Sequence, residues 1–111
     1  MAGWFELSKS KDDQFRFVLK TWDGGIVLVS ELYTTKAAAQ NGIASVQSNS
    51  PQDERYERKT AVNGKFYFTL KAVNHQVIGT SEMYASEELR EQGIAAVKAN
   101  GSVDMVKDLT A

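Results

Sequence analysis

The chain has 111 residues, of which 42% are hydrophobic and 24% charged, with a formal net charge of −1 and no cysteine. This length and composition are typical of one folded globular domain, and they exclude disulfide bridges, cysteine nucleophiles and thiolate metal sites. The sequence shows neither a basic, apolar leader nor an apolar run long enough to span a membrane, so we expect a cytoplasmic protein without membrane contact.

Three antiparallel strands are predicted before residue 30. Trp4–Leu7 is a short, largely apolar segment, and Phe15–Lys20 alternates apolar and polar residues as a strand buried on one face does. Asp23-Gly24-Gly25 is typical of a hairpin turn, and it leads into the β-branched segment Ile26–Val29.

A helix is predicted near residues 36–48, because the spacing of apolar residues changes from two to three or four after Tyr33. Thr35 is a suitable N-cap, and Asn49 stands at the expected end, where asparagine tolerates the left-handed conformation of a C-cap. Gly42 in the middle costs about 1 kcal/mol relative to alanine. We therefore expect the helix to approach the sheet or another helix closely at this glycine.

The same pattern recurs 51 residues further along the chain. Residues 4–50 align with residues 55–101 without a gap, and 13 of the 47 aligned positions are identical. The identical pairs are Glu6/Glu57, Phe15/Phe66, Phe17/Phe68, Leu19/Leu70, Lys20/Lys71, Ser30/Ser81, Glu31/Glu82, Tyr33/Tyr84, Gly42/Gly93, Ile43/Ile94, Ala44/Ala95, Val46/Val97 and Asn49/Asn100. We infer an internal duplication with repeats at residues 4–50 and 55–108 of a single domain spanning residues 1–111.

The second repeat has the same predicted elements as the first. Its strands are Arg55–Lys59, Phe66–Lys71 and Gln76–Ile78, and its helix lies near residues 87–99 with Ser86 as N-cap. One repeat alone leaves a strand edge unpaired and too much apolar sheet for one helix. We therefore predict an α+β fold in which the two repeats share one sheet with pseudo-twofold symmetry, and a monomeric protein. Ser102–Asp108 is predicted as a weak last strand.

Several segments resemble the YegP-like family of small bacterial proteins of unknown function. They are Ala2–Ser8, Asn63–Phe68, Leu70–Ala72, Ser81-Glu82 with Tyr84, and Gly93–Ala95. The resemblance covers nearly the whole chain. It implies two copies of a β-β-β-α-β motif in one mostly antiparallel sheet with exchanged C-terminal strands.

For this chain the resemblance implies that Ser102–Asp108 pairs with the first repeat. It also implies that Gln52–Lys59 is both the last strand of one repeat and the first strand of the next. Arg55 and Arg58 replace Trp4 and Leu7 of the first repeat, which leaves open which way this joining strand faces. The resemblance brings no activity, cofactor or catalytic residue.

Catalytic and metal-binding constellations are not recognised in the sequence, so we expect no enzyme activity, metal or cofactor. The single histidine, His75, falls in a predicted hairpin turn at the position that Gly24 has in the first repeat, and we interpret it as a turn residue.

A glutamate and a tyrosine precede each helix, as Glu31 with Tyr33 and Glu82 with Tyr84. A carboxylate beside a phenol can perform acid–base chemistry or bind a small molecule, which is one functional alternative. In the structural interpretation, the tyrosine packs over the helix start and the glutamate accepts hydrogen bonds from backbone amides there.

Basic and aromatic residues are predicted on the sheet face that the helices leave open. They are Trp4, Arg16, Lys20, Trp22, Arg55, Lys59, Tyr67 and Lys71, with Glu6 and Glu57 on the same face. Our first hypothesis is a non-catalytic binding module that uses this face for a partner not identified by the sequence. Binding of single-stranded nucleic acid by stacking and charge is a further alternative.

Overall fold

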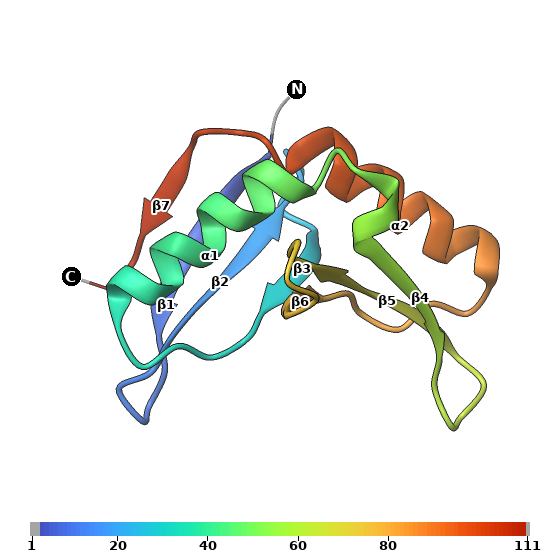
Figure 1. Cartoon of the computed structure of the whole chain (residues 1–111), viewed down its shortest axis with the longest axis horizontal. Helices are drawn as coiled ribbons and strands as arrows, with labels where there is room; N and C mark the ends of the chain where they lie inside the picture. The colour runs from blue at the N-terminus through green and yellow to red at the C-terminus, as the bar shows by residue number, and fades with distance from the viewer. Residues whose placement is uncertain (1–2, 111) are drawn as a thin grey trace.

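The computed structural model describes residues 3–110, which form seven strands and two helices. The elements are β1 (Trp4–Lys9), β2 (Phe15–Lys20), β3 (Ile26–Ser30), α1 (Lys36–Asn49), the 3₁₀ turn η1 (Asp53–Arg55), β4 (Tyr56–Thr60), β5 (Phe66–Lys71), β6 (Val77–Thr80), α2 (Glu87–Asn100) and β7 (Val106–Asp108). The strands form one sheet in the order β4-β5-β6-β3-β2-β1-β7. Both helices lie over the same face of this sheet (Figure 1), so the predicted α+β fold is confirmed.

The two repeats join through the central strands β3 and β6. Val29 pairs with Thr80 and Ser30 with Gly79 in an antiparallel register. Gly79 and Leu28 occupy equivalent positions of the two repeats, and a Cβ atom on Gly79 would lie 2.8 Å from Leu28 Cγ. The two repeats therefore meet through one large and one small residue at a position where two large side chains would collide.

The core lies between the sheet and the two helices, where apolar side chains from alternate strand positions meet the helices. Each helix contacts strands of both repeats, since α1 packs on β2, β5 and β6, and α2 packs on β5, β2 and β3. The fully buried large side chains include Phe5, Phe17, Leu19, Leu28, Phe68, Leu70, Ile94 and Val97. One core therefore spans the two repeats.

The mid-helix glycines make room for tyrosine rings. Tyr33 forms an isolated antiparallel bridge with Phe15, as Tyr84 does with Phe66. A Cβ atom on Gly42 would lie 2.9 Å from the ring of Tyr33, and Gly93 would meet Tyr84 in the same way. The predicted close approach of helix to sheet is confirmed, and each tyrosine ring packs against the glycine in the middle of its helix.

Four turn residues have positive φ angles, and they form two pairs 51 residues apart. Asp13 and Gly64 have φ of 60° and 83°, and Gly24 and His75 have φ of 89° and 68°. His75 also donates its backbone N–H to the carbonyl of Ala72 at 2.9 Å. The interpretation of His75 as a turn residue is therefore confirmed.

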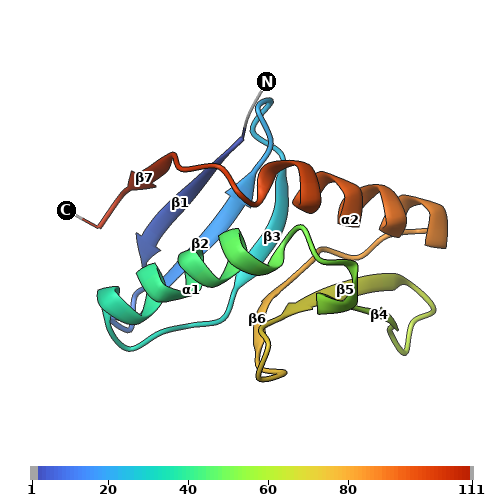
Figure 2. The ribbon, with the colours of Figure 1, turned by 45° about the horizontal axis from the view of Figure 1, so that its top comes forward.

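The predicted helix N-caps are confirmed, whereas the predicted C-caps are wrong. Thr35 Oγ1 accepts the N–H of Ala38, and Ser86 Oγ accepts the N–H of Leu89, each at 3.1 Å. The residues after the helices, Ser50 and Gly101, have right-handed φ angles of −58° and −69°. The C-terminal ends of α1 and α2 meet here (Figure 2), because Ser50 packs directly on Gly101.

The asparagines at the helix ends connect each repeat to the start of the other. Asn49 accepts a hydrogen bond from Arg55 Nε at 3.1 Å, and Asn100 accepts the backbone N–H of Gly3 at 2.9 Å. Each side chain also donates to a carbonyl one turn back in its own helix. These bonds explain the repeated asparagine better than a left-handed cap does.

The C-terminal strand pairs with the first repeat, as expected. β7 lies parallel to β1, with Phe5 opposite Val106 and Leu7 opposite Asp108. The expectation for Gln52–Lys59 is wrong for its first half, because residues 53–55 form η1 and only Tyr56–Thr60 is a strand. A 3₁₀ turn closes here because the N–H of Tyr56 is bound by the carbonyl of Asp53. No helix among residues 3–110 is long and apolar enough to cross a membrane.

Candidate functional site

The sheet face opposite the helices carries two ion-paired clusters at equivalent places of the two repeats. In the first, Glu6 accepts a hydrogen bond from Trp4 Nε1 at 2.8 Å and pairs with Lys20 at 3.2 Å. Lys107 from β7 lies over the indole of Trp4, 4.4 Å from its centroid. These contacts lower the pKa of Glu6, chiefly through the hydrogen bond from Trp4. Trp4 and Lys20 thus lie together on this face.

The second cluster lies around Glu57 on β4. Its carboxylate pairs with Lys71 at 3.1 Å and with Lys59 at 3.2 Å, and the hydrogen bond from Lys71 is the main reason why its pKa is lowered. Tyr67 pairs with Lys59 in the β4–β5 ladder. Because side chains directly opposite in a ladder share a face, Tyr67 belongs to the same surface.

Arg16 lies exposed on β2 between the inward-facing residues Phe15 and Phe17. Alternation along the strand turns its side chain to the face opposite the helices. Two other predicted residues lie elsewhere. Arg55 is in η1 and binds Asn49 at the end of α1, so its assignment to the open face is wrong. Trp22 is 59% exposed in the turn after β2, outside the ladder.

The repeated glutamates do not perform the structural role that the sequence suggested. One helix-start amide of each repeat, that of Ala38 or of Leu89, is instead bound by the side chain of Thr35 or Ser86, and no hydrogen bond of the Glu31 or Glu82 carboxylate is found among residues 3–110. A repeated serine is structural instead, since Ser30 Oγ accepts the N–H of Phe17 at 2.8 Å and donates to the carbonyl of Glu31 at 2.7 Å. The hydroxyl of Ser81 makes the corresponding two bonds.

Glu31 and Tyr33 line a groove of about 260 Å³ between α1 and the turn joining β5 to β6. Burial raises the pKa of Tyr33, and the charge of Glu31 adds to this effect. The polar residues along the groove are Asn41, Ser45, Asn74 and Gln76, and its lining contains no lysine or arginine. Among residues 3–110 no three histidine, aspartate or glutamate side chains are placed to hold a metal ion.

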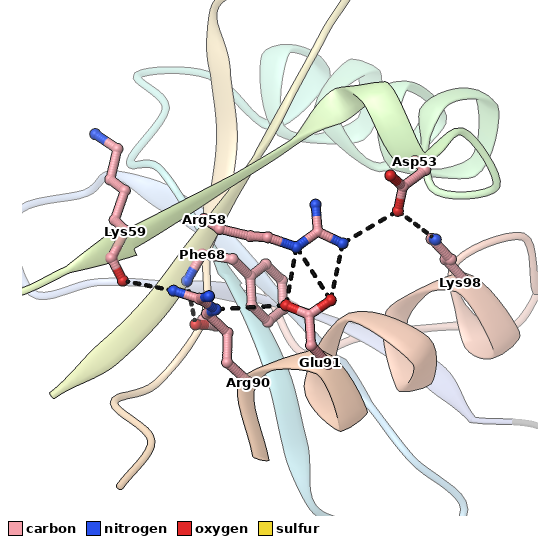
Figure 3. A network of polar contacts seen from close by, with 8 residues as sticks. Asp53, Arg58, Lys59, Phe68, Arg90, Glu91 and Lys98 are labelled. Atoms are coloured by element: carbon pink, nitrogen blue, oxygen red, sulfur yellow. Dashed lines mark hydrogen bonds and ion pairs between the residues drawn. The ribbon is translucent and has the colours of Figure 1, made fainter. Parts of the chain in front are cut away.

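A charged network that sequence reasoning missed covers the junction of β4 and α2 (Figure 3). Arg58 donates from Nε and Nη2 to both oxygens of Glu91 at 2.8 to 3.0 Å, and from Nη2 to Asp53 at 3.2 Å. Lys98 pairs with the same Asp53 oxygen at 2.7 Å. Arg58 lowers the pKa of Glu91, and Lys98 with Arg58 lowers that of Asp53. The facing of β4 is thereby decided, with Arg58 on the helix side.

A signal for this network does exist in the aligned repeats. Arg58, Glu91 and Lys98 stand where the first repeat has the uncharged residues Leu7, Gln40 and Gln47. Three charges gained together at positions that converge in space indicate a shared contact, but their convergence becomes visible only in the folded chain.

Comparison with known proteins identifies similar chains over the full length. The model of a family described as a domain of unknown function (DUF1508) matches residues 10–57 and 61–108. The UPF0339 protein YegP of Shigella flexneri is 70% identical over 99% of this chain and 100% of its own. A UPF0339 protein of Shewanella oneidensis is 57% identical over 99% of this chain and 100% of its own.

Two solution NMR structures have the same fold. That of yegP from E. coli, described as a protein of unknown function, has a TM-score of 0.95 at 68% identity, covering 100% of this chain and 96% of that one. That of the UPF0339 protein from Shewanella oneidensis has a TM-score of 0.94 at 57% identity, covering 99% and 93%.

Proposed function

The chain belongs to the DUF1508 family of unknown function and is close to YegP itself, and from this premise we propose that it is a non-catalytic binding module. Its contact surface is the sheet face opposite the helices, around Trp4, Arg16, Lys20 and Tyr67. The observation that carries the proposal is that two clusters on this face, around Glu6 and around Glu57, are held in place by internal contacts before any partner arrives.

Preorganised side chains favour binding because less rotamer entropy is lost when they are immobilised by a partner. The Trp4–Glu6–Lys20 and Glu57–Lys59–Lys71 clusters supply aromatic and charged groups of this kind. Tryptophan, tyrosine and arginine, which this face presents as Trp4, Tyr67 and Arg16, are also enriched at the centres of protein interfaces, whereas lysine is not. A protein partner with a mixed polar and apolar surface fits this face best.

Single-stranded nucleic acid is a weaker candidate for the same face. Its affinity would come largely from phosphates replacing the counterions of lysine and arginine. Here the lysines are already paired, Lys20 with Glu6, and Lys59 and Lys71 with Glu57. Each of these carboxylates cancels the charge of one lysine, and a phosphate would have to compete with Glu6 and Glu57 for the lysines of this face.

The proposal is tested by photo-crosslinking in living bacteria. A photoreactive amino acid replaces Arg16 or Tyr67 on the proposed face, and the matched control replaces Ser48, which is exposed on α1. We expect one discrete crosslinked species from positions 16 and 67 and none from position 48. Crosslinks of equal strength from all three positions, or from position 48 alone, would refute the assignment of this face.

Titration of the labelled protein with short single-stranded DNA and RNA separates the two kinds of partner. Shifts of the amides of Arg16 and Tyr67 that weaken steeply with salt would favour nucleic acid. An unchanged spectrum together with crosslinking at positions 16 and 67 would favour a protein partner.

A small-molecule site is supported by one separate observation, the groove that holds Glu31, Tyr33 and Asn41. With one carboxylate and several neutral polar groups, it suits an amine or a polyol and not an anion. A panel of such metabolites followed by amide shifts tests this alternative. Shifts confined to the groove would support it, and their absence would remove it.

A further inference from the structure

The groove that holds Glu31 and Tyr33 continues along α1 into a second hollow. The two hollows, of about 260 and 490 Å³, share four lining residues, Asn41, Ser45, Ala72 and Asn74. The larger one extends toward the C-terminal end of α1 as far as Ser48, with Val73 of the β5–β6 turn also in its lining. Together they form one groove with room for a compact organic molecule.

The groove carries its charge on one acidic side chain. Glu31 is exposed and makes no salt bridge within residues 3–110, and neither hollow is lined by lysine or arginine. His75 lies in the same turn as Asn74 but does not belong to the lining. Glu31 thus differs from Glu6 and Glu57, which are paired with lysines of the sheet face. Its carboxylate is available to a cationic ligand.

The carboxylate lies near a phenol that also lacks a partner in the protein. Burial, and then the charge of Glu31, raise the pKa of Tyr33, and the Tyr33 hydroxyl lies beside Gly42 in the lining. Within the described part of the chain, neither this hydroxyl nor the side-chain amides of Asn41 and Gln76 make a hydrogen bond. Such neutral groups both donate and accept hydrogen bonds, so they suit the hydroxyl groups of a ligand.

Alignment of the repeats shows that this lining is largely a property of the first repeat. Glu82 and Tyr84 repeat the acid and the phenol. Five other aligned positions differ in size or polarity, namely Ser45/Ala96, Ser48/Ala99, Gln76/Gly25, Ala38/Leu89 and Val73/Trp22. The small and polar members all belong to the groove beside Glu31. Because the second repeat folds without them, the fold does not require them.

The lining disfavours most other classes of charged metabolite. A phosphate or a zwitterionic amino acid needs a cationic partner for its negative group, and the groove has none. A polyamine carries several positive charges, for which the lining offers the single carboxylate of Glu31. A neutral sugar does not use this carboxylate. A single ammonium group on a body rich in hydroxyls uses both the charge and the neutral polar groups.

We propose that the groove binds an amino sugar with a free amine, whose ammonium pairs with Glu31 and whose hydroxyls bond to Asn41 and Gln76. The apolar C–H face of the sugar ring then packs on Ala72 in the lining. The inference rests on the small-molecule alternative for this groove, and it is independent of the sheet-face proposal because none of these residues lies on that face.

Three ring compounds test the proposal when they are titrated into the labelled intact protein at slightly acidic pH. Glucosamine carries an ammonium and hydroxyls, glucose has only the hydroxyls, and cyclohexylamine has only the ammonium. We expect glucosamine to shift the amides of Asn41, Asn74 and Gln76 and to bind at least about tenfold more tightly than either other compound. Glucosamine 6-phosphate should bind more weakly than glucosamine, because its phosphate meets no cation.

Variants taken from the second repeat make the test specific. Ala38→Leu introduces the residue that α2 carries at Leu89, and we expect it to fill the groove and weaken glucosamine binding at least about tenfold. Glu31→Gln removes the charge and should weaken binding to a similar extent. The matched control, Glu82→Gln, should leave binding unchanged. Amide spectra that are unchanged outside the groove verify that each variant is folded.

Several results would overturn the proposal. They are equal binding of glucosamine and glucose, equal binding of glucosamine and cyclohexylamine, or the same loss of affinity in Glu31→Gln and Glu82→Gln. Groove shifts caused only by another class of amine, such as the N-terminus of a short peptide amide, would remove the amino sugar and leave the groove as a binding site. The absence of groove shifts with every compound would remove both.

Discussion

Tyr33 and Tyr84, which form bridges to β2 and β5, explain why each helix has a glycine at its middle although glycine disfavours helix formation. Tyr33 and Tyr84 stack on Phe17 and Phe68 with the same centroid separation of 6.3 Å. Their rings occupy the space that a Cβ atom on Gly42 or Gly93 would need. Glycine is therefore needed at this position of each helix because a tyrosine outside the helix fills the space of a larger side chain.

We therefore expect Gly42→Ala to destabilise the protein. Alanine improves helix propensity by about 1 kcal/mol, but overpacking against Tyr33 costs about 1–3 kcal/mol. The change should be followed by urea unfolding, together with Tyr33→Phe and the double variant. Removal of the hydroxyl should restore part of the loss. Gly93→Ala with Tyr84→Phe is the internal replicate. An increase in the free energy of unfolding caused by either alanine alone would contradict this explanation.

The Arg58–Glu91 pair predicts a dependence of stability on acid pH. Because the pKa of Glu91 is lowered in the folded protein, its contribution is present above the unfolded pKa of about 4.3 and is lost as the pH falls through the folded value. Arg58→Gln should raise the pKa of Glu91 and flatten the fall in stability between neutral and acid pH.

The pair is partly exposed, at 33% and 46% of the two side chains, so the loss at neutral pH should stay below about 1 kcal/mol. Carboxyl NMR titration and urea unfolding at several pH values measure the two effects. Lys9→Gln, which removes an exposed pair with Asp13, is the control. An unchanged pKa of Glu91 in Arg58→Gln would show that the pair does not form in solution.

At the scale of single elements, β7 is the strand whose presence distinguishes the two edges. It has only three residues, all exposed, and is tied to β1 by backbone bonds on either side of Val106–Asp108. Lys36 and Gln47 of α1 add a salt bridge to Asp108 and a hydrogen bond to the carbonyl of Val103. β7 is therefore held in place mainly by hydrogen bonds and a salt bridge, and not by burial of its side chains.

Hydrogen exchange should reveal this difference between the repeats. In the intact chain we expect the amide of Leu7 to exchange at least about tenfold more slowly than that of Arg58, because only β1 is covered. Truncation after residue 104 should remove the difference by exposing Leu7. The amide of Leu19 in β2 lies away from this edge and is the control. Equal exchange of Leu7 and Arg58 in the intact chain would contradict the assigned edges.

The sequence predicted most elements because each of their signals is local and appears twice. The helices expected near residues 36–48 and 87–99 occur at 36–49 and 87–100, and the alternation of Phe15–Lys20 identified a half-buried strand. The facing of β4 could not be predicted, because the helix-side position of Arg58 contradicts the alternation and is decided by Glu91, 33 residues away. Likewise, Arg55 was predicted as the first residue of a strand but belongs to the 3₁₀ turn η1. The hydrogen bond from the N–H of Tyr56 to the carbonyl of Asp53 that closes this turn cannot be recognised from the spacing of apolar residues.

For the candidate surface, the sequence predicted only which strand residues lie on the same side of the sheet. Trp4, Lys20 and Lys59 lie in clusters organised by Glu6 and Glu57, which the sequence placed on the same face without indicating that they pair with the lysines. Lys107 could not be assigned at all, since its contact with Trp4 depends on β7 crossing to the other repeat. Long-range strand exchange thus determines chemistry that the local pattern cannot show.

At the scale of the whole molecule, the repeats are interlocked and not merely adjacent. β7 of the second repeat covers β1 of the first, and Asn100 binds Gly3 while Arg55 binds Asn49. Each helix also packs on strands of both repeats. Neither half therefore has a complete core of its own, and each would expose the central strand that normally pairs with the other.

We expect that residues 1–51 and residues 52–111, produced as separate chains, do not fold alone at low concentration but combine in a 1:1 complex. Chains of about 50–60 residues bury too little surface for a stable fold when part of their core is missing. Circular dichroism, amide NMR spectra and light scattering of each half and of the mixture measure this directly. In the mixture, the amides of Phe5 and Gly3 should regain the exchange protection of the intact chain, because β7 and Asn100 return to them. A folded monomer of either half would show that a single repeat is self-sufficient, and that the exchanged contacts only join two domains that are already complete.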